Sequence, residues 1–263
     1  MNPKASFSCW LPSRLAFCVA AVFGVIPSQA DVTWTAQTRT LEASAEASVG
    51  SVVDGPWVGL DDASDFGVFD SAVEPLAVAF LGRDIAIVQG VANQYSVLGL
   101  SSFVARGEAS VSMTLTPVVG ASGSATGSST FEVRFYVGEP SLFSLSGVLD
   151  TQAILTGGAS VPFLDNEVGL ERTDDNTLIF ESGSNDTVLA EAGPLIPGNY
   201  RFWASAEVDA SQASIVSGPR TVAGISEFDL QLMVMGIPET STYLSMLGLA
   251  GVVSLVGYRR VRA

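Results

Sequence analysis

Hydrophobic and polar residues alternate along much of the chain, most clearly over 130–137, 199–209 and 226–234. A repeat of two residues predicts β-strands that bury one face, as in antiparallel sheets with one side open to water. Weaker alternation predicts further strands at 32–40, 42–51, 84–98, 101–115, 141–149, 167–172 and 177–181. The region between the two ends shows no convincing helical period, so we expect an all-β protein.

The alternation also assigns a face to each side chain in two of the strongest predicted strands. The buried face collects Phe131, Val133, Phe135, Val137, Tyr200, Phe202, Ala204, Ala206 and Val208. The opposite face then carries Tyr136 and Trp203 beside charged residues. Large aromatic side chains usually pack in a core, so these two are the first candidates for contact with a ligand.

Turn residues such as Gly157-Gly158 and Pro197-Gly198 separate the predicted strands. Residues 120–129 are small and polar, which suits a linker or an edge strand. Short strands joined by such turns predict one all-β domain over residues 31–236. We expect an antiparallel two-sheet sandwich with jelly-roll or Greek-key connections.

The first thirty residues have the three parts of a secretory signal peptide. Lys4 and Arg14 make the start basic, residues 15–26 are apolar, and small residues follow at Ser28 and Ala30. We expect cleavage after Ala30, because the apolar run is short for a membrane span of about 20 residues. The alternative is an uncleaved N-terminal anchor.

A second apolar run, 243–258, lies near the C-terminus and is followed at once by Arg259, Arg260 and Arg262. This pattern predicts a transmembrane helix at 243–258 whose arginine-rich end stays in the cytoplasm. With a signal peptide at the other end of the chain, the domain between them is expected outside the cytoplasm.

Just before this run stand Pro238, Glu239, Thr240 and Ser241. A Pro-Glu motif, an apolar helix and an arginine-rich terminus follow one another over residues 237–263. Together they resemble the PEP-CTERM sorting signal of Gram-negative bacteria that make exopolysaccharide. Thr240 stands where that family usually has a second proline. The resemblance implies that an exosortase, a membrane-embedded processing enzyme, recognises the tail. The alternative is an ordinary single-span anchor, which has the same physical layout.

The composition excludes most catalytic machinery. The chain has no histidine, its two cysteines lie in the predicted signal peptide, and Lys4 is its only lysine. The remaining domain therefore lacks the residues for catalytic triads, Schiff-base chemistry or ordinary zinc sites. We expect neither an enzyme nor a cofactor, although hydrolysis by paired carboxylates stays open.

The charge balance limits the partners further. The chain has 27 acidic residues against 12 basic ones, a formal net charge of −15. Such a chain is expected to repel nucleic acid and anionic lipid. Asp61, Asp62 and Asp65 concentrate oxygen ligands in one stretch and are weak candidates for calcium binding. The alternative is a solvated acidic loop.

Carbohydrate binding is the sharper hypothesis. Tyr136 and Trp203 fall on the polar face of their strands beside Arg134 and Arg201, and such an aromatic residue can stack on a sugar ring while its neighbours bond the hydroxyls. The alternative is that a loop covers this face and makes Trp203 a second core residue.

These features predict an exported bacterial protein, briefly anchored in the inner membrane and then processed by an exosortase. Its expected place is the cell surface or extracellular matrix, with a structural or adhesive role in the exopolysaccharide of a biofilm. A carbohydrate-binding module at the cell surface is the alternative. A carboxylate-dependent glycoside hydrolase is the third hypothesis.

Overall fold

The computed structural model describes residues 28–116, 120–183, 187–213 and 218–237. The chain divides into two compact units, one of Ala30–Met235 and one of the terminal segments Met1–Gln29 and Gly236–Ala263. The predicted sorting motif, the predicted helix at 243–258 and the arginines after it lie outside the described residues, as does most of the predicted signal peptide. Within the described part, no helix is both long and apolar enough for a membrane span.

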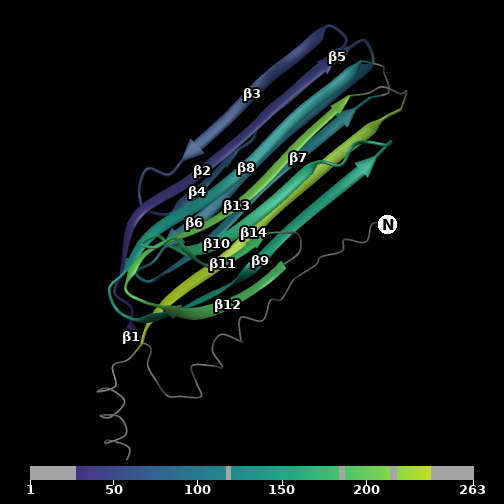
Figure 1. Ribbon diagram of the computed structural model, residues 1–263. Coiled ribbons are helices and arrows are strands. Elements are labelled where there is room, and N and C mark those ends of the chain that lie inside the picture. Colours follow the sequence, from purple (N-terminus) through teal and green to yellow (C-terminus); the bar gives the residue numbers. More distant parts are fainter. Residues whose placement is uncertain (1–27, 117–119, 184–186, 214–217, 238–263) are drawn as a thin grey trace, which may run out of the picture. The chain divides into compact units, whose positions relative to one another are not determined.

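Strands make up nearly all of the regular structure, and the described residues contain no helix. The strands are β1 (Ser28–Gln29), β2 (Val32–Val49), β3 (Val52–Asp62), β4 (Phe69–Val73), β5 (Leu76–Leu81), β6 (Asp84–Leu98), β7 (Ser102–Leu115), β8 (Ala121–Val137), β9 (Ser141–Thr156), β10 (Phe163–Arg172), β11 (Thr177–Gly183), β12 (Thr187–Leu195), β13 (Gly198–Ala213) and β14 (Arg220–Gly236). Figure 1 shows the long strands lying side by side.

The strands of the unit Ala30–Met235 form two sheets. Sheet A has the order β12-β9-β14-β7-β6-β4, with β5 also paired to β6, and sheet B has the order β11-β10-β13-β8-β2-β3. Neighbouring strands pair antiparallel, for example β13 with β8 and β14 with β7. The prediction of an all-β fold with two antiparallel sheets is confirmed.

Aromatic rings from both sheets meet between the two layers. The ring centroid of Phe103, in sheet A, lies 4.9 Å from that of Phe131 and 4.7 Å from that of Phe202, both in sheet B. The nine residues predicted to face inward, from Phe131 to Val208, are each at most 1% exposed. Each large apolar side chain buried in this way stabilises the fold by roughly 1.5–3 kcal/mol.

Residues 120–129 form neither a linker nor an edge strand, so that prediction was wrong. They begin β8, which pairs with β13 on one side and with β2 on the other. Small residues are needed because the sheets approach closely here. A Cβ on Gly123 would lie 2.4 Å from the side chain of Val88, and one on Gly127 would lie 2.4 Å from the carbonyl oxygen of Val91. A composition typical of linkers instead lets two backbones pack together.

Each strand predicted from alternation overlaps a strand of the structure, and 32–40 joins 42–51 in the single strand β2. The sequence analysis missed β3, β4, β5 and β12, and the two-residue β1 inside the predicted signal peptide. Four of these, β3, β4, β5 and β12, lie at the edges of the sheets, and in β3 and β12 residues on both sides are partly exposed. These two strands therefore show little alternation, which is why the pattern did not reveal them.

Candidate functional site

The outer face of sheet B, the side turned away from sheet A, gathers the charged and aromatic residues that the sequence analysis singled out. Antiparallel pairing of β10, β13 and β8 arranges their residues in rows across the strands. Two adjacent rows contain Glu171, Arg201 and Arg134, and then Gly169, Trp203 and Glu132. The structure therefore brings three of the four predicted carbohydrate contacts together, and the fourth, Tyr136, follows on β8.

Glu132 lies between two arginines. Its Oε2 accepts a hydrogen bond from Arg201 at 2.7 Å and its Oε1 accepts one from Arg134 at 3.0 Å. Burial alone would raise the pKa of Glu132, but the hydrogen bonds and charges of the two guanidinium groups outweigh it and lower the pKa. Glu132 is thus an ionised carboxylate with a donor on each oxygen.

Arg201 is held from three directions. Besides its bond to Glu132, its Nη1 lies 3.5 Å from a carboxylate oxygen of Glu171. Its guanidinium carbon lies 5.0 Å from the centroid of the Trp203 ring, within the range of a cation–π contact. The hydrogen bond to Glu132 is the largest cause that raises the pKa of Arg201. Two carboxylates and one ring fix the orientation of this planar group.

Trp203 lies over the backbone of β10. A Cβ on Gly169 would be 2.1 Å from Cζ2 of the indole, so only glycine leaves room for the ring. The indole Nε1 donates a hydrogen bond to Glu167 at 2.6 Å. The side chain is half-buried, which differs from the covered core residue that the alternative interpretation required. Trp203 is a fixed aromatic group on an outer face.

Tyr136 is the more open aromatic of this face, at 41% exposure. It follows Arg134 on β8 and lies opposite Asn199 of β13. The face thus combines one open ring, one half-buried ring and a charged network between them.

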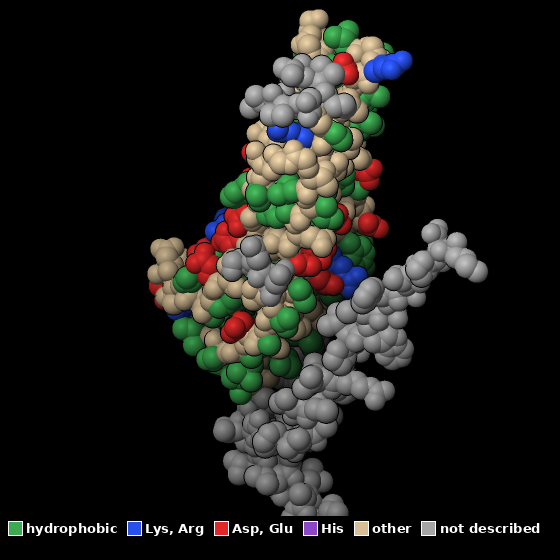
Figure 2. Space-filling view, turned by 90° about the vertical axis from the view of Figure 1, so that its right-hand side faces the viewer, with side chains coloured by type: hydrophobic (Ala, Val, Ile, Leu, Met, Phe, Trp, Pro, Cys, Tyr) green, Lys and Arg blue, Asp and Glu red, His purple; other side chains and the backbone are tan. Residues whose placement is uncertain are grey.

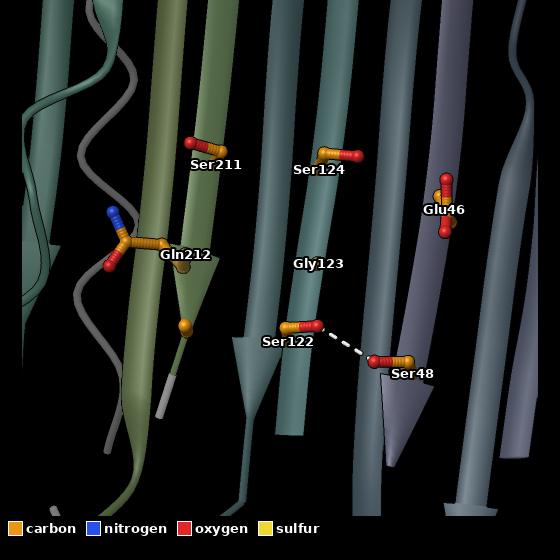
Figure 3. Close-up of a pocket in the computed structure, with 8 residues that line it drawn as sticks. Glu46, Ser48, Ser122, Gly123, Ser124, Ser211 and Gln212 are labelled. Carbon is orange, nitrogen blue, oxygen red and sulfur yellow. Dashed lines mark hydrogen bonds between the residues drawn. The ribbon is translucent and has the colours of Figure 1, made fainter. Parts of the chain in front are cut away.

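Farther along the same sheet, the outer face is hollowed into a groove of about 310 Å³ (Figure 3). Ser211 of β13, Ser122 and Ser124 of β8, and Glu46 and Ser48 of β2 line it. The hydroxyls of Ser48 and Ser122 form a hydrogen bond of 2.7 Å across the strands. The sequence analysis did not identify this groove, because its residues on β8 had been interpreted as a linker.

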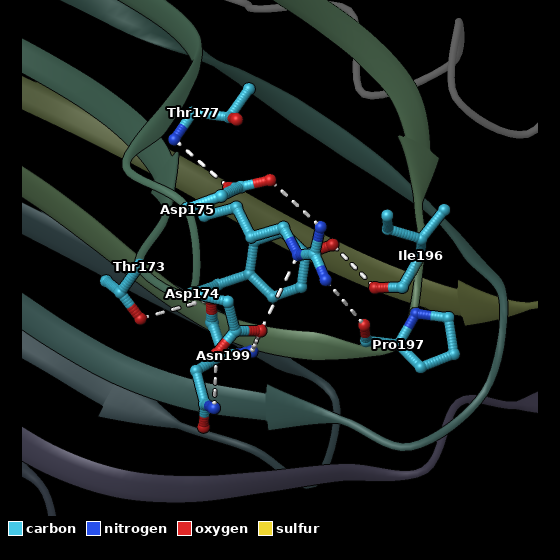
Figure 4. Close-up of polar contacts among 9 residues, drawn as sticks. Thr173, Asp174, Asp175, Thr177, Ile196, Pro197 and Asn199 are labelled. Atoms are coloured by element: carbon cyan, nitrogen blue, oxygen red, sulfur yellow. Dashed lines mark hydrogen bonds and ion pairs between the residues drawn. The ribbon is translucent and has the colours of Figure 1, made fainter.

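A hairpin anchors the start of β13, the strand that carries Arg201 and Trp203 (Figure 4). Asp174, between β10 and β11, accepts hydrogen bonds from the backbone nitrogen of Asn199 at 2.9 Å and from its Nδ2 at 2.8 Å. These bonds, the side-chain one first, lower the pKa of Asp174. Arg172 donates to the carbonyl of Pro197 at 3.3 Å. The hairpin therefore holds the turn into β13.

The same turn is fixed from inside the core. The hydroxyl of Tyr200 donates a hydrogen bond of 2.6 Å to the carbonyl of Ile196, four residues earlier. Tyr200 is 1% exposed, and its ring centroid stacks 5.5 Å from that of Phe135. With both sides of the turn held, the outer residues of β13 keep a defined position before any ligand arrives.

Two of the three calcium candidates, Asp61 and Asp65, accept local hydrogen bonds. Asp61 bonds the hydroxyl of Ser71, and its other oxygen accepts the backbone nitrogen of Asp62 at 2.9 Å. Asp65 accepts the backbone nitrogen of Gly67 at 2.8 Å. Among the described residues, no three or more acidic side chains gather as a group that could hold a metal. Calcium binding stays a prediction without a gathered ligand set.

The loop that contains Asp65 wraps around a buried arginine that the sequence analysis missed. Arg39 is 1% exposed and donates to the carbonyls of Asp65 and Gly67, the latter at 2.7 Å. Burial lowers the pKa of Arg39, and the charge of Asp65 offsets part of that effect. Alternation within 32–40 puts Val32, Trp34 and Ala36 on the apolar face and residue 39 on the opposite one. A register shift between Trp34 and Ala36 reverses the faces and turns Arg39 inward with Leu41. This arginine has a structural role in holding the loop.

The outer face of sheet A carries a second charged group. Glu227 of β14 lies opposite Glu108 of β7, and Asp229 lies opposite Arg106 at a salt-bridge distance of 3.1 Å. The residue is exposed, but its carboxylate is partly desolvated, and this desolvation first, and then the negative charges of Asp150 and Glu108, raise the pKa of Glu227. A cavity of about 90 Å³ adjoins Glu227 and Asp150. Ligand pockets usually measure about 300 Å³ or more, so this cavity is small for a sugar.

Acidic side chains dominate the charged groups of the surface. In the view of Figure 2 they gather around the middle, with only isolated basic side chains between them. This distribution agrees with the net charge of −15. A surface of this kind repels polyanions at moderate ionic strength.

Ala30, the predicted last residue of the signal peptide, is 6% exposed and belongs to the core of its unit. A peptidase could reach the bond after it only before that unit folds. Cleavage there stays a prediction.

No model of a known protein family matches this chain, and no curated protein matches it either. The resemblance of the C-terminal tail to a sorting signal therefore depends on the residues of that tail alone.

Proposed function

We propose that this chain is an exported surface or matrix protein that adheres to polysaccharide through the outer face of sheet B. The observation that carries the proposal is the arrangement around Glu132. Tyr136 and Trp203 flank a set of arginines and glutamates whose positions are fixed by mutual hydrogen bonds. No nucleic acid partner is proposed, because the surface is acidic.

The chemistry of this face suits a sugar. A sugar ring presents an apolar face, which an aromatic side chain can cover, and hydroxyls at its edge, which charged groups can bond. Arg134 is 56% exposed in its side chain and offers donors to such hydroxyls. Because the network is already ordered, binding loses little side-chain entropy.

The strand order supports the proposal at the level of architecture. Strands β7 to β14 alternate between the sheets, apart from the β10–β11 hairpin within sheet B, so that β12-β9-β14-β7 in sheet A faces β11-β10-β13-β8 in sheet B. We infer from this order an eight-stranded jelly roll, extended by β2 and β3 in sheet B and by β4 to β6 in sheet A. Lectin domains use this architecture, although a fold alone does not determine a function.

Export and sorting form the second half of the proposal. The signal peptide would direct the chain out of the cytoplasm, and an exosortase would process the tail after Pro238 and Glu239. Intact mass spectrometry of the protein from its native host, in membrane and secreted fractions, tests this. We expect a species that starts at Asp31 and lacks the residues after about Glu239. A membrane species that still ends at Ala263 would mean an ordinary anchor.

Binding is tested with a pair of matched tyrosines. Tyr136 and Tyr95 are both 41% exposed, and each lies beside an arginine, on the outer faces of sheet B and sheet A respectively. We expect the full chain in detergent to bind polysaccharides on a glycan array. Tyr136→Ala should weaken that binding at least tenfold, about 1.4 kcal/mol, because it removes the open ring.

Tyr95→Ala is the control, since it removes an equally exposed ring from the other face. It should leave the affinity unchanged. Equal losses in both variants would mean that the tyrosines act through general stability, and an array without any reproducible signal would overturn the binding proposal.

A hydrolase is the second candidate because of Glu227. A general acid needs a raised pKa and a neighbouring carboxylate, and Glu227 has both in Asp150 and Glu108. Glu132 does not meet this condition, because its pKa is lowered. The release of reducing ends from a polysaccharide, abolished by Glu227→Gln, would support hydrolysis. We expect no such release, since the adjoining cavity is only about 90 Å³.

A further inference from the structure

The candidate site and the serine-lined groove lie on one continuous strip of sheet B. Both sit on the paired strands β13 and β8, whose register runs from Asn199 opposite Tyr136 to Ala213 opposite Ser122. A strand rises about 3.3 Å per residue, so Tyr136 and Ser122 are about 45 Å apart along β8. This length exceeds a single sugar ring and suits a chain of several units.

The strip between the two ends is lined by short side chains on β8, and we call it the trough. The outward residues of β8 along it are all short hydroxyl side chains, namely Ser122, Ser124, Thr126, Ser128 and Thr130. Longer acidic side chains stand at some of the flanking positions, with Glu207 and Asp209 on β13 and Glu42 and Glu46 on β2, and the other flanking residues are short. A floor of short side chains with longer ones beside it can receive an extended chain that lies along the strands.

The charges of the trough select the kind of chain. None of its four flanking carboxylates forms a salt bridge with an arginine in the described part of the protein. The arginines at the aromatic end, Arg134 and Arg201, are already paired with Glu132. An anionic polysaccharide would therefore meet unpaired negative charge along most of its length. A neutral one would meet hydroxyls and carboxylates that accept hydrogen bonds from its own hydroxyl groups.

We propose that the ligand is a neutral polysaccharide chain that runs along β8 from the Tyr136 and Trp203 end to the groove at Ser124. The inference rests on the proposed binding function and extends it, by naming the ligand class and a second subsite. The aromatic end holds one sugar unit firmly, and the trough adds weaker hydrogen bonds for each further unit. Affinity should therefore rise with the length of the oligosaccharide.

The test is calorimetry of the full chain in detergent with neutral gluco- and manno-oligosaccharides of increasing length, and with oligogalacturonates as anionic counterparts. Ser124→Trp places a large side chain in the groove, and a strand accommodates tryptophan well. It should leave the dissociation constant of the shortest bound oligosaccharide unchanged and weaken the longest at least fivefold. Ser112→Trp, at an exposed serine on the outer face of sheet A, is the matched control and should change neither.

The outcomes separate the two proposals. If Tyr136→Ala abolishes binding but Ser124→Trp affects no length, the binding function stands and the trough is wrong. Tighter binding of oligogalacturonates than of neutral chains would overturn the ligand class. If the unaltered protein binds none of these sugars, the proposed function fails, and the inference fails with it. Circular dichroism of both tryptophan variants verifies that each has kept its strands.

Discussion

The outer faces of the two sheets place the same residue type in opposite surroundings. On sheet B, Glu132 lies between Arg134 and Arg201, and its pKa is lowered. On sheet A, Glu227 lies opposite Glu108, with Asp150 also near, and its pKa is raised. Like charges across a strand pair are destabilising, whereas opposite charges contribute roughly 0.2–1 kcal/mol.

The charged residues on sheet B form an ordered network of opposite charges, whereas Glu227 on sheet A lies among residues of like charge. On sheet B the charges are complementary, and Arg201 orients the ring of Trp203. The neighbouring strand β10 has a glycine, Gly169, where any larger residue would clash with that ring. On sheet A, Arg106 pairs with Asp229 in an exposed salt bridge, with side chains 62% and 54% accessible. Exposed pairs of this kind contribute little. Ordered complementarity, rather than the number of charges, is what marks the outer face of sheet B as a binding surface.

The largest expected effect comes from a substitution at Gly169, which disrupts the arrangement on sheet B. Gly169→Ala places a Cβ 2.1 Å from Cζ2 of Trp203, so the ring must leave its position. We expect the free energy of unfolding, measured by urea denaturation, to fall by about 2 kcal/mol. Sugar binding should weaken as well, because Trp203 and Arg201 no longer hold each other.

A double variant verifies the cause. In Gly169→Ala combined with Trp203→Ala there is no ring for the new methyl group to meet. The double variant should then be scarcely less stable than Trp203→Ala alone. If the losses of stability in the two single variants add up in the double variant, Gly169 is required by its own backbone conformation and not by the ring of Trp203.

Glu132→Gln is the next largest change. It removes the carboxylate that both arginines bond, and we expect a loss of about 1 kcal/mol at neutral pH, discounted for the exposure of Arg134. The folded-state pKa of Glu132 is lowered. Its contribution is therefore complete above the ordinary glutamate pKa of about 4.3 and is lost as the pH falls through the lowered value. Urea denaturation at neutral and acidic pH should show the two proteins converge in acid, and a loss that is constant with pH would contradict the ionic explanation.

The sequence predicted the aromatic part of this face but not its charged network. Alternation alone turns Tyr136 and Trp203 outward, because it depends only on neighbours along one strand. The bond between Arg201 and Glu132 joins residues 69 positions apart. It depends on the register of β13 against β8, which no pattern within either strand contains.

The groove illustrates the opposite failure. The small residues that line it on β8 could be recognised in the sequence. However, Gly, Ala and Ser are common both in linkers and in strands where two sheets pack closely. Only the position of Val88 above Gly123 distinguishes the two, and that is a tertiary contact. Arg39 was missed for a similar reason. Alternation within 32–40 turns residue 39 outward, and only the register shift between Trp34 and Ala36 in the pairing with β8 turns it inward, where its charge must have partners.

The smallest expected effect sharpens the comparison most, because it has the opposite sign. Glu227→Gln removes a charge from a crowded row, so we expect stability at neutral pH and low salt to rise by about 0.3 kcal/mol. The folded-state pKa of Glu227 is raised. The ionised side chain therefore destabilises the fold increasingly as the pH rises from its ordinary pKa through the raised value, and not at all in acid. Across that pH window, denaturation curves should show that Glu227→Gln becomes more stable than the unaltered protein toward neutral pH, whereas Glu132→Gln becomes less stable.

Added salt should remove the gain in stability of Glu227→Gln, since Glu227 is exposed and screening acts on it. If both glutamine variants lose stability, the two faces do not differ in the way their pKa directions indicate, and the case for a preorganised site on sheet B weakens with them.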